Sequence, residues 1–415
     1  METYQKMLDS FLQSEIEELF IGFVCKKIKE SGLVLNSDQI EKIRKAITEH
    51  RLISDLNLSF NESQVDSSIN KLTTSGNVSV SLDDSSELEK SVNDLLADFP
   101  NIINNESQNI ATVIFDGMNK NFGKYYKWTQ KEKFRFEKDL KNIWGEPILL
   151  LEMLLVISHE CRDAFSVSFS QEAEKDNDYV FVTLVRLHAR ACQIGMEILT
   201  LIKNGFADGA HARWRTLHEI AVTSMFINQH GNDVAERYIF HDIIQRFKLC
   251  EDYKNYSEQL HMPKVEDDEL GEIQEEYNNA LARFGNSFKH DYGWAANELE
   301  IKRPTFKDIE KAVAMDSMRP YYTLACQNVH ANVRAAFFKL GIPDNPEILL
   351  AGPSMYGLED PGQGAALSLM QTTTALLTCR PTFDTLIYCS VIKMLYEKIA
   401  NSFVVTEQNL DGCEL

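Results

Sequence analysis

Apolar residues recur at helical spacing along almost the whole chain. Between residues 3 and 30 they fall three or four positions apart, and a second helical pattern starts at Ser37. From about Asn105 to the end the same spacing continues nearly without interruption, and a strand-like alternation is limited to residues 78–82. The pattern therefore predicts an all-α fold, a multi-helix bundle, because amphipathic helices bury their apolar stripes against one another.

One stretch near the N-terminus lacks this periodicity. Residues 51–91 contain eleven serines and repeated Asn and Asp residues, which is typical of a connecting segment. We predict three regions: an N-terminal helical region at residues 1–50, a Ser-rich linker that can hold a small hairpin at 51–104, and a main helical domain at 105–415. A chain of 415 residues is long enough for more than one domain, since single cores stop growing at roughly 250–300 residues.

Turn-forming residues divide the main domain into successive predicted helices. Their ranges are 106–121, 130–143, 147–168, 172–204, 207–229, 232–256, 268–286, 307–339, 364–379 and 382–402. Gly and Pro concentrate in residues 341–364, which indicates an ordered loop before the last two helices.

The predicted helix at 172–204 is mostly apolar but carries one polar stripe. Its members are spaced i, i+4, i+7 and i+11, so they lie along one side of the helix: Arg186, Arg190, Gln193 and Glu197. Asn204-Gly205 then forms a tight turn, so the next helix is expected to fold back against this one.

That next helix carries a second polar group near its start. We expect one face to hold His211, Arg215, His218 and Glu219, while Trp214 and Leu217 pack against neighbours. Two facing helices with these residues can enclose a pocket in which guanidinium groups hold a phosphate or carboxylate and an imidazole moves protons. The alternative is a ladder of structural ion pairs, for instance between Arg215 and Glu219 at i, i+4 spacing.

The run from Glu197 to Glu219 resembles the signature of an uncharacterised bacterial family, domain of unknown function 5677. That signature has a helix ending near a glycine, a small residue, and then an arginine and a glutamate separated by three residues, matched here by Arg215 and Glu219. A later helix with a tyrosine and a valine-histidine pair is matched by Tyr322 and Val329-His330. The resemblance covers about residues 150–400 and implies that His330 meets Arg215 and Glu219. Cys326 stands where the pattern has a serine.

The helical architecture and the arginine and histidine content also resemble the HEPN group of small ribonucleases found in toxin and phage-defence systems. These enzymes cut RNA without metal through an arginine and a histidine with four to six residues between them, a spacing that Arg213 and His218 match. The resemblance implies a metal-independent endoribonuclease in which Arg215, His218, Glu219 and His330 are catalytic and Arg186, Arg190 and Arg213 bind the substrate. The same arginine-to-histidine spacing also occurs by chance elsewhere in the chain.

The chain has 42 Lys and Arg against 62 Asp and Glu, a net charge of −20 that disfavours general binding of nucleic acid. Residues 120–141 run against this charge, because basic residues there interleave with aromatic ones. Lys127, Trp128 and Lys131 in this segment are candidate RNA contacts, since aromatic rings stack on bases while cations neutralise phosphates. The alternative is a basic helix that packs on an acidic domain.

No secretory signal precedes the first helix, and the most apolar window, residues 147–158, is too short to span a bilayer. The cysteines have no zinc or disulfide spacing, so we expect a cytoplasmic protein with reduced thiols. The chain has no nucleotide-binding, metal or hydrolase motif of the common classes, and we expect no cofactor and no metal.

Two functions follow as hypotheses. The first is a stress or phage-defence effector with HEPN-like endoribonuclease activity. The second is a non-catalytic helical scaffold or sensor that binds a partner protein or a small anionic ligand, with the N-terminal helices available to a protein partner.

Overall fold

The computed structural model describes residues 2–49, 86–261, 263, 266–330, 333–342 and 349–411. In these ranges every regular element is a helix and no strand is present, which confirms the all-α prediction. The hairpin predicted around residues 78–82 lies outside the described residues, as does most of the predicted linker. Within the described ranges, no helix has an apolar stretch long enough to cross a membrane.

The chain divides into two units, Met1–Lys127 and Trp128–Leu415, and the boundary falls inside helix α3 (Ser86–Asp176). This helix replaces three predicted ones and begins within the range predicted as linker. Pro147 does not end it, because Trp144 and Leu151 on either side are buried in the core, and this packing outweighs the cost of a helix-interior proline.

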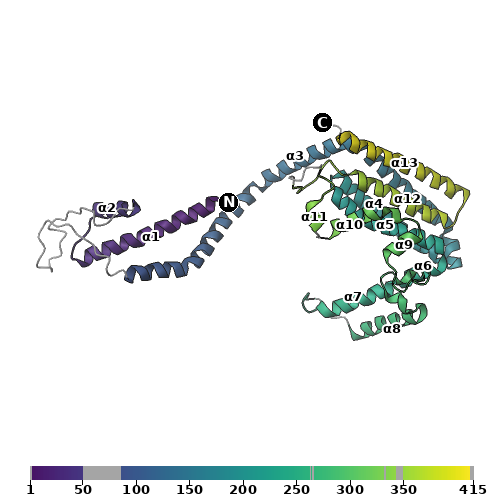
Figure 1. Cartoon of the computed structure of the whole chain (residues 1–415), viewed down its shortest axis with the longest axis horizontal. Helices are drawn as coiled ribbons and strands as arrows, with labels where there is room; N and C mark the ends of the chain where they lie inside the picture. The colour runs from purple at the N-terminus through teal and green to yellow at the C-terminus, as the bar shows by residue number, and fades with distance from the viewer. Residues whose placement is uncertain are drawn as a thin grey trace. The chain divides into compact units, whose positions relative to one another are not determined.

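The first unit contains α1 (Glu2–Glu30), α2 (Ser37–Thr48) and the beginning of α3 (Figure 1). Asn36 caps α2 in a capping box, in which its side chain accepts from the backbone of Gln39 and the Gln39 side chain accepts from the backbone of Asn36. The three helices share a small apolar core formed by Phe23, Val24, Ile28, Leu33, Ile43 and Leu88.

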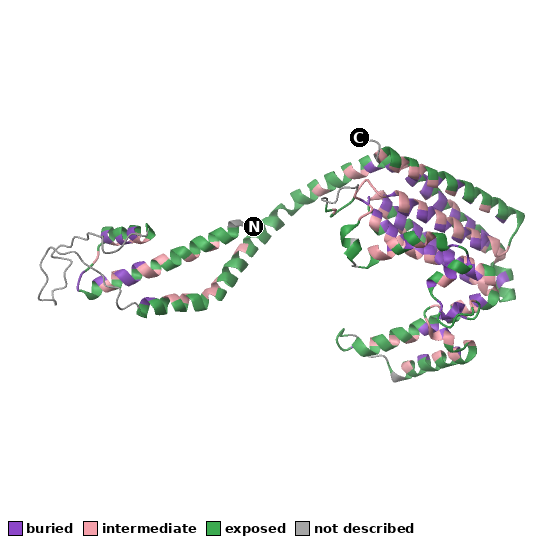
Figure 2. Ribbon diagram, viewed as in Figure 1, coloured by how far each residue is buried: buried purple, intermediate pink, exposed green. Residues whose placement is uncertain are grey.

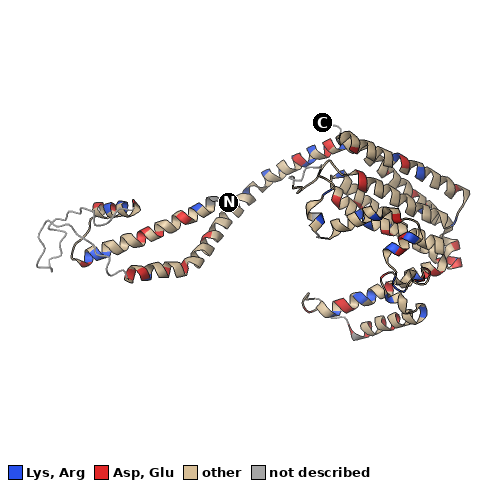
Figure 3. Ribbon diagram, in the orientation of Figure 1, with Lys and Arg blue, Asp and Glu red and all other residues tan. Residues whose placement is uncertain are grey.

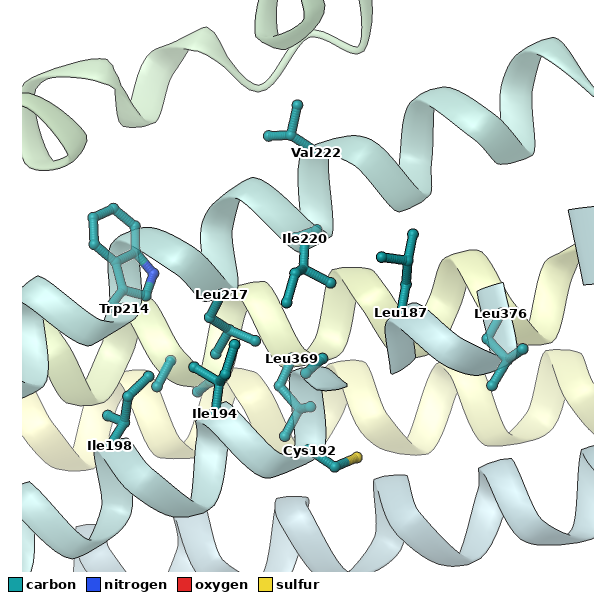
Figure 4. Packing of buried hydrophobic residues seen from close by; sticks show 14 of the residues in the cluster. Leu187, Cys192, Ile194, Ile198, Trp214, Leu217, Ile220, Val222, Leu369 and Leu376 are labelled. Atoms are coloured by element: carbon teal, nitrogen blue, oxygen red, sulfur yellow. The ribbon is translucent and has the colours of Figure 1, made fainter. Parts of the chain in front are cut away.

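The second unit is built around a helix bundle. Helix α5 (Ala207–His230) packs against α4 (Tyr179–Lys203) and α12 (Glu359–Thr378), and α12 also packs against α13 (Phe383–Asp411). Figure 2 shows the buried positions concentrated on these central helices, and Figure 4 shows the leucine and isoleucine side chains that α4, α5 and α12 contribute. This apolar packing fixes the position of α5, the helix with the polar residues of interest.

The turn between α4 and α5 forms where Asn204-Gly205 predicts it. Gly205 has a φ of +75°, in the left-handed region that favours glycine. The backbone N–H of Ser354 donates to the Gly205 carbonyl at 2.9 Å, so the loop before α12 also contacts this turn.

In the described part of the chain, six shorter α-helices complete the second unit. They are α6 (Asn232–Phe240), α7 (Asp242–Tyr256), α8 (Asp267–Phe284), α9 (Phe306–Ala312), α10 (Arg319–Val329) and α11 (Val333–Phe337). Of these, α6, α9 and α10 pack against α5, α7 packs against α6 and α8, and α11 packs against α10. The sequence predicted one helix at 232–256 and one at 307–339, and both predictions are wrong in the same way. The first divides at His241, whose buried ring anchors the 288–290 loop, and the second divides at Ala314, which has a φ of +55°.

Candidate functional site

His211 and His218 lie on the buried face of α5, whereas the sequence predicted that they share a polar, pocket-lining face with Arg215 and Glu219. The His211 ring stacks on the Trp214 ring with centroids 5.3 Å apart. The His218 ring is tilted against the same tryptophan, also with centroids 5.3 Å apart. All three side chains are almost fully buried. The helical spacing was correct, but it could not distinguish a solvent-facing polar stripe from histidines that stack on a core tryptophan.

His218 belongs to a buried polar chain with two residues that the sequence analysis missed. Its Nε2 lies 2.9 Å from Oε1 of Glu310 on α9, and the other oxygen of Glu310 forms an ion pair with Arg319 at the start of α10. The side chains of His218 and Glu310 are 1% and 0% exposed. Burial, together with the nearby Arg319 charge, lowers the pKa of His218 to about 4, so the imidazole is neutral at pH 7.

Arg215, Glu219 and Tyr322 form a second network beside this chain. Arg215 donates from Nε to the Tyr322 hydroxyl at 3.1 Å and lies 3.1 Å from the Glu219 carboxylate, while the Tyr322 hydroxyl donates to Glu219. The side chains of Arg215 and Glu219 are each 29% exposed. Burial and the hydrogen bond to Glu219 raise the pKa of Tyr322, so its hydroxyl stays protonated.

Arg213 is also paired. Its guanidinium contacts the Glu197 carboxylate across the α4–α5 interface and lies 3.4 Å from the Thr216 hydroxyl. Arg213 and Arg215 therefore sit in the ion-pair arrangement that the sequence analysis offered as the alternative to a substrate pocket.

His330 occupies a different place from the one that the family resemblance implied. His330 is the C-cap residue of α10 and is exposed. Tyr322, eight residues earlier on the same helix, is the residue that bonds to Arg215 and Glu219. Eight residues of α-helix span about 12 Å. In the described part of the chain the His330 side chain makes no hydrogen bond or ion pair with Arg215 or Glu219, so the structure does not bring these three residues together.

Arg186 and Arg190 lie on the exposed side of α4. Both line a groove of about 1080 Å³ together with Tyr238 and Trp294. Neither arginine forms an ion pair with a described residue, in contrast to Arg213 and Arg215. Arg186 and Arg190 of the α4 stripe are therefore exposed at a groove, whereas Arg213, Arg215 and His218 of α5 are engaged with partner side chains.

The basic-aromatic segment predicted at residues 120–141 is part of α3, and its aromatic side chains are exposed except for Phe136, which packs against the core. Trp128 is 59% exposed, and Lys127 and Lys131 are also exposed. Figure 3 shows the Lys and Arg positions along this part of the helix. RNA contact by these residues stays a prediction.

Sequence reasoning missed Glu310 and Arg319, and it assigned Tyr322 no role beyond its place in the motif. Glu310 lies on a short helix whose sequence, Phe306–Ala312, reads as an ordinary polar segment. Its complete burial follows from docking of α9 against α5, a tertiary contact that no local pattern encodes.

Comparison with known proteins agrees with part of this picture. Residues 181–348 match the model of a family described as a family of unknown function, DUF5677. None of the curated proteins and none of the solved structures matches the chain. The matched range is narrower than the predicted 150–400 and contains α5 with Arg215 and Glu219. The predicted resemblance is thus confirmed: over residues 181–348 the chain carries the DUF5677 family region.

Proposed function

We propose that this protein is a non-catalytic helical binding protein that holds a small anionic ligand in the α4 groove through Arg186 and Arg190. One observation carries the proposal. Of the four arginines that the sequence analysis placed at the site, Arg213 and Arg215 are neutralised by glutamates, whereas Arg186 and Arg190 are exposed, unpaired among described residues and at a groove.

The geometry of the two groove arginines suits an oxyanion. They are four residues apart on one helix, so their guanidinium groups lie on the same side and can approach one carboxylate or phosphate. Tyr238 and Trp294 supply apolar walls for the rest of the ligand, and a groove of about 1080 Å³ is in the range of small-molecule sites.

Acidic residues also line this groove, but half of them are already engaged. Asp178 accepts from Arg380 and caps α4, and Asp291 forms an ion pair with Lys248 at 2.6 Å. Glu174 and Asp242 are left to balance the two arginines. Their charges offset those of Arg186 and Arg190, so the proposed anion site rests on the placement of the two guanidinium groups and not on a net positive charge of the groove.

The endoribonuclease hypothesis has less support. A general acid or base must reach the substrate within hydrogen-bond distance, and His218 is buried with Nε2 engaged by Glu310. His330 is exposed but away from Arg215. In favour of the hypothesis, Arg215 and Glu219 are only partly buried and lie together with the buried Tyr322.

Incubating the purified protein with total RNA in EDTA separates the two functions. Intact RNA supports the binding protein. Cleavage that disappears in His218→Ala or His330→Ala, with thermal stability retained, supports the ribonuclease and refutes our proposal.

The groove itself is tested by thermal shift with a panel of carboxylates and phosphate esters. A ligand at one hundred times its Kd adds about 2.7 kcal/mol to the unfolding free energy, so binding raises the Tm. We expect Arg186→Ala and Arg190→Ala to abolish the rise, and Arg246→Ala, an exposed arginine outside the groove, to leave it unchanged. A panel with no stabilising member, or a rise that survives in both groove variants, contradicts the proposal.

A further inference from the structure

A second depression, separate from the groove arginines, is enriched in cations. It has a volume of about 520 Å³ and is lined by residues of α7, of α8 and of the segment between α8 and α9. Three of the lining residues are cations in a chain of net charge −20: Lys248, Lys289 and Arg303.

Two of these cations are available for a ligand. Lys248 forms an ion pair with Asp291 at 2.6 Å, so its charge is compensated. Lys289 and Arg303 form no hydrogen bond or ion pair with a described residue through their side chains. All three cations lie near the His290 imidazole. The pKa of His290 is lowered first by desolvation and then by the charges of Arg303, Lys289 and Lys248. The depression therefore has a positive local potential.

Aromatic rings form part of the same lining. Tyr277 is held by stacking on Phe247, with ring centroids 4.2 Å apart, and Tyr292 is held against Phe306 at 6.2 Å. Burial and the neighbouring Glu219 raise the pKa of Tyr292 to about 12, so it is a neutral ring with a protonated hydroxyl. Tyrosines beside unpaired cations match a ligand that has both a planar ring and a phosphate.

The segment that carries Lys289 and His290 is fixed in place. The buried His241 ring lies 3.0 Å from the Phe288 carbonyl and 2.8 Å from the His290 carbonyl through Nε2. Gly293 follows at a point where a Cβ would lie 2.3 Å from the Phe288 carbonyl oxygen, so only glycine fits. A cation on such a segment loses little conformational freedom on binding.

We propose that this depression binds a nucleotide, with Lys289 and Arg303 holding the phosphates and Tyr277 and Tyr292 contacting the base. A volume of about 520 Å³ lies within the range of small-molecule sites. Asp291 lines both depressions, but Lys289 and Arg303 line only this one and Arg186 and Arg190 line only the α4 groove, so either proposal can fail without the other.

Isothermal titration calorimetry of the full chain with ATP in EDTA tests this site. We expect saturable binding, with adenosine and inorganic tripolyphosphate each binding at least about tenfold more weakly because each lacks one of the two recognised parts. Lys289→Ala and Arg303→Ala are expected to weaken ATP binding about tenfold or more. Lys393→Ala, an exposed lysine on α13, and the groove variants Arg186→Ala and Arg190→Ala are expected to bind ATP as the unmodified chain does.

Three results overturn the proposal: no saturable ATP binding, ATP affinity unchanged in both cation variants, or tripolyphosphate binding as tightly as ATP. Loss of ATP binding in Arg186→Ala but not in Lys289→Ala also overturns it, because that result assigns the nucleotide to the α4 groove. Since Arg303 is exposed, Arg303→Glu serves as a second variant that keeps the fold and reverses the charge.

Discussion

Replacing Glu310 by alanine tests whether the polar residues of α5 hold the fold together. Glu310 is fully buried and is the shared partner of His218 and Arg319. The Glu310→Ala change leaves the His218 Nε2 without its acceptor and the Arg319 guanidinium without its counter-ion, and it also leaves a void. We therefore expect the family region to lose a large part of its stability.

The expected magnitude comes from the burial of the two contacts. Breaking a buried ion pair by removing one partner costs about 3–5 kcal/mol. Arg319 is 26% exposed, so water can partly solvate it after the change, and the lower half of this range applies. For a unit of this size, about 3–4 kcal/mol corresponds to a fall in Tm of roughly 6–16 °C.

Intrinsic tryptophan fluorescence measures this change selectively. All four tryptophans, Trp128, Trp144, Trp214 and Trp294, lie in the second unit, so thermal or urea unfolding followed by fluorescence reports on that unit. The matched control is Glu298→Ala, which removes the carboxylate from another histidine–glutamate pair. That pair is 25% and 42% exposed, so its loss is expected to cost about 1 kcal/mol or less.

The reasoning is refuted if Glu310→Ala unfolds within about 1 kcal/mol of the unmodified chain, as expected of an exposed pair. A second outcome also counts against it: equal losses for Glu310→Ala and Glu298→Ala would mean that burial does not decide the cost.

Three further predictions follow from the same structure. Burial lowers the pKa values of His188, His211 and His218 to about 3, 4 and 4, whereas the unfolded value is about 6.5. The unfolded chain therefore binds more protons below pH 6.5, and the unfolding free energy should fall as the pH drops from about 6.5 to 4; a flat stability profile there contradicts it. Gly364→Ala places a Cβ 2.8 Å from Trp214 Nε1 and should cost about 1–3 kcal/mol in urea unfolding. Reversing two exposed charges, Lys127→Glu with Lys131→Glu, should weaken RNA binding in a gel-shift assay and reduce its salt dependence, and unchanged binding would remove residues 120–141 from consideration.

Much of the fold could be predicted from spacing alone. The limits of α1, α2, α5 and α8 follow from apolar periodicity and from flanking Ser, Asn and Gly residues. The errors arose where a tertiary contact decided the outcome. Pro147 predicts a helix break, but α3 continues through it because residues on both sides are buried. His241 lies within a helical sequence pattern, but its ring bonds to the 288–290 loop and the helix is interrupted there.

The candidate site was predictable to a smaller extent. The pairing of Arg215 with Glu219 follows from i, i+4 spacing and was foreseen as one alternative. Tyr322 and Glu310, which complete the two networks, come from helices about one hundred positions away. One-dimensional spacing contains no information on which distant helix docks against α5, so Glu310 could not be identified from the sequence, and Tyr322 was named only through the family resemblance.

The division between engaged and available arginines affects how relatives of this chain should be compared. The pair of Arg215 and Glu219, inside the matched range 181–348, is held by Tyr322 in the helical framework, while Arg186 and Arg190 are on its surface. Two proteins that share Arg215 and Glu219 are then expected to share the helical framework around them, and the ligands that they bind can still differ. If our two proposals hold, proteins that match this family model are better grouped by function through the residues at positions 186 and 190, and at 289 and 303, than through Arg215 and Glu219.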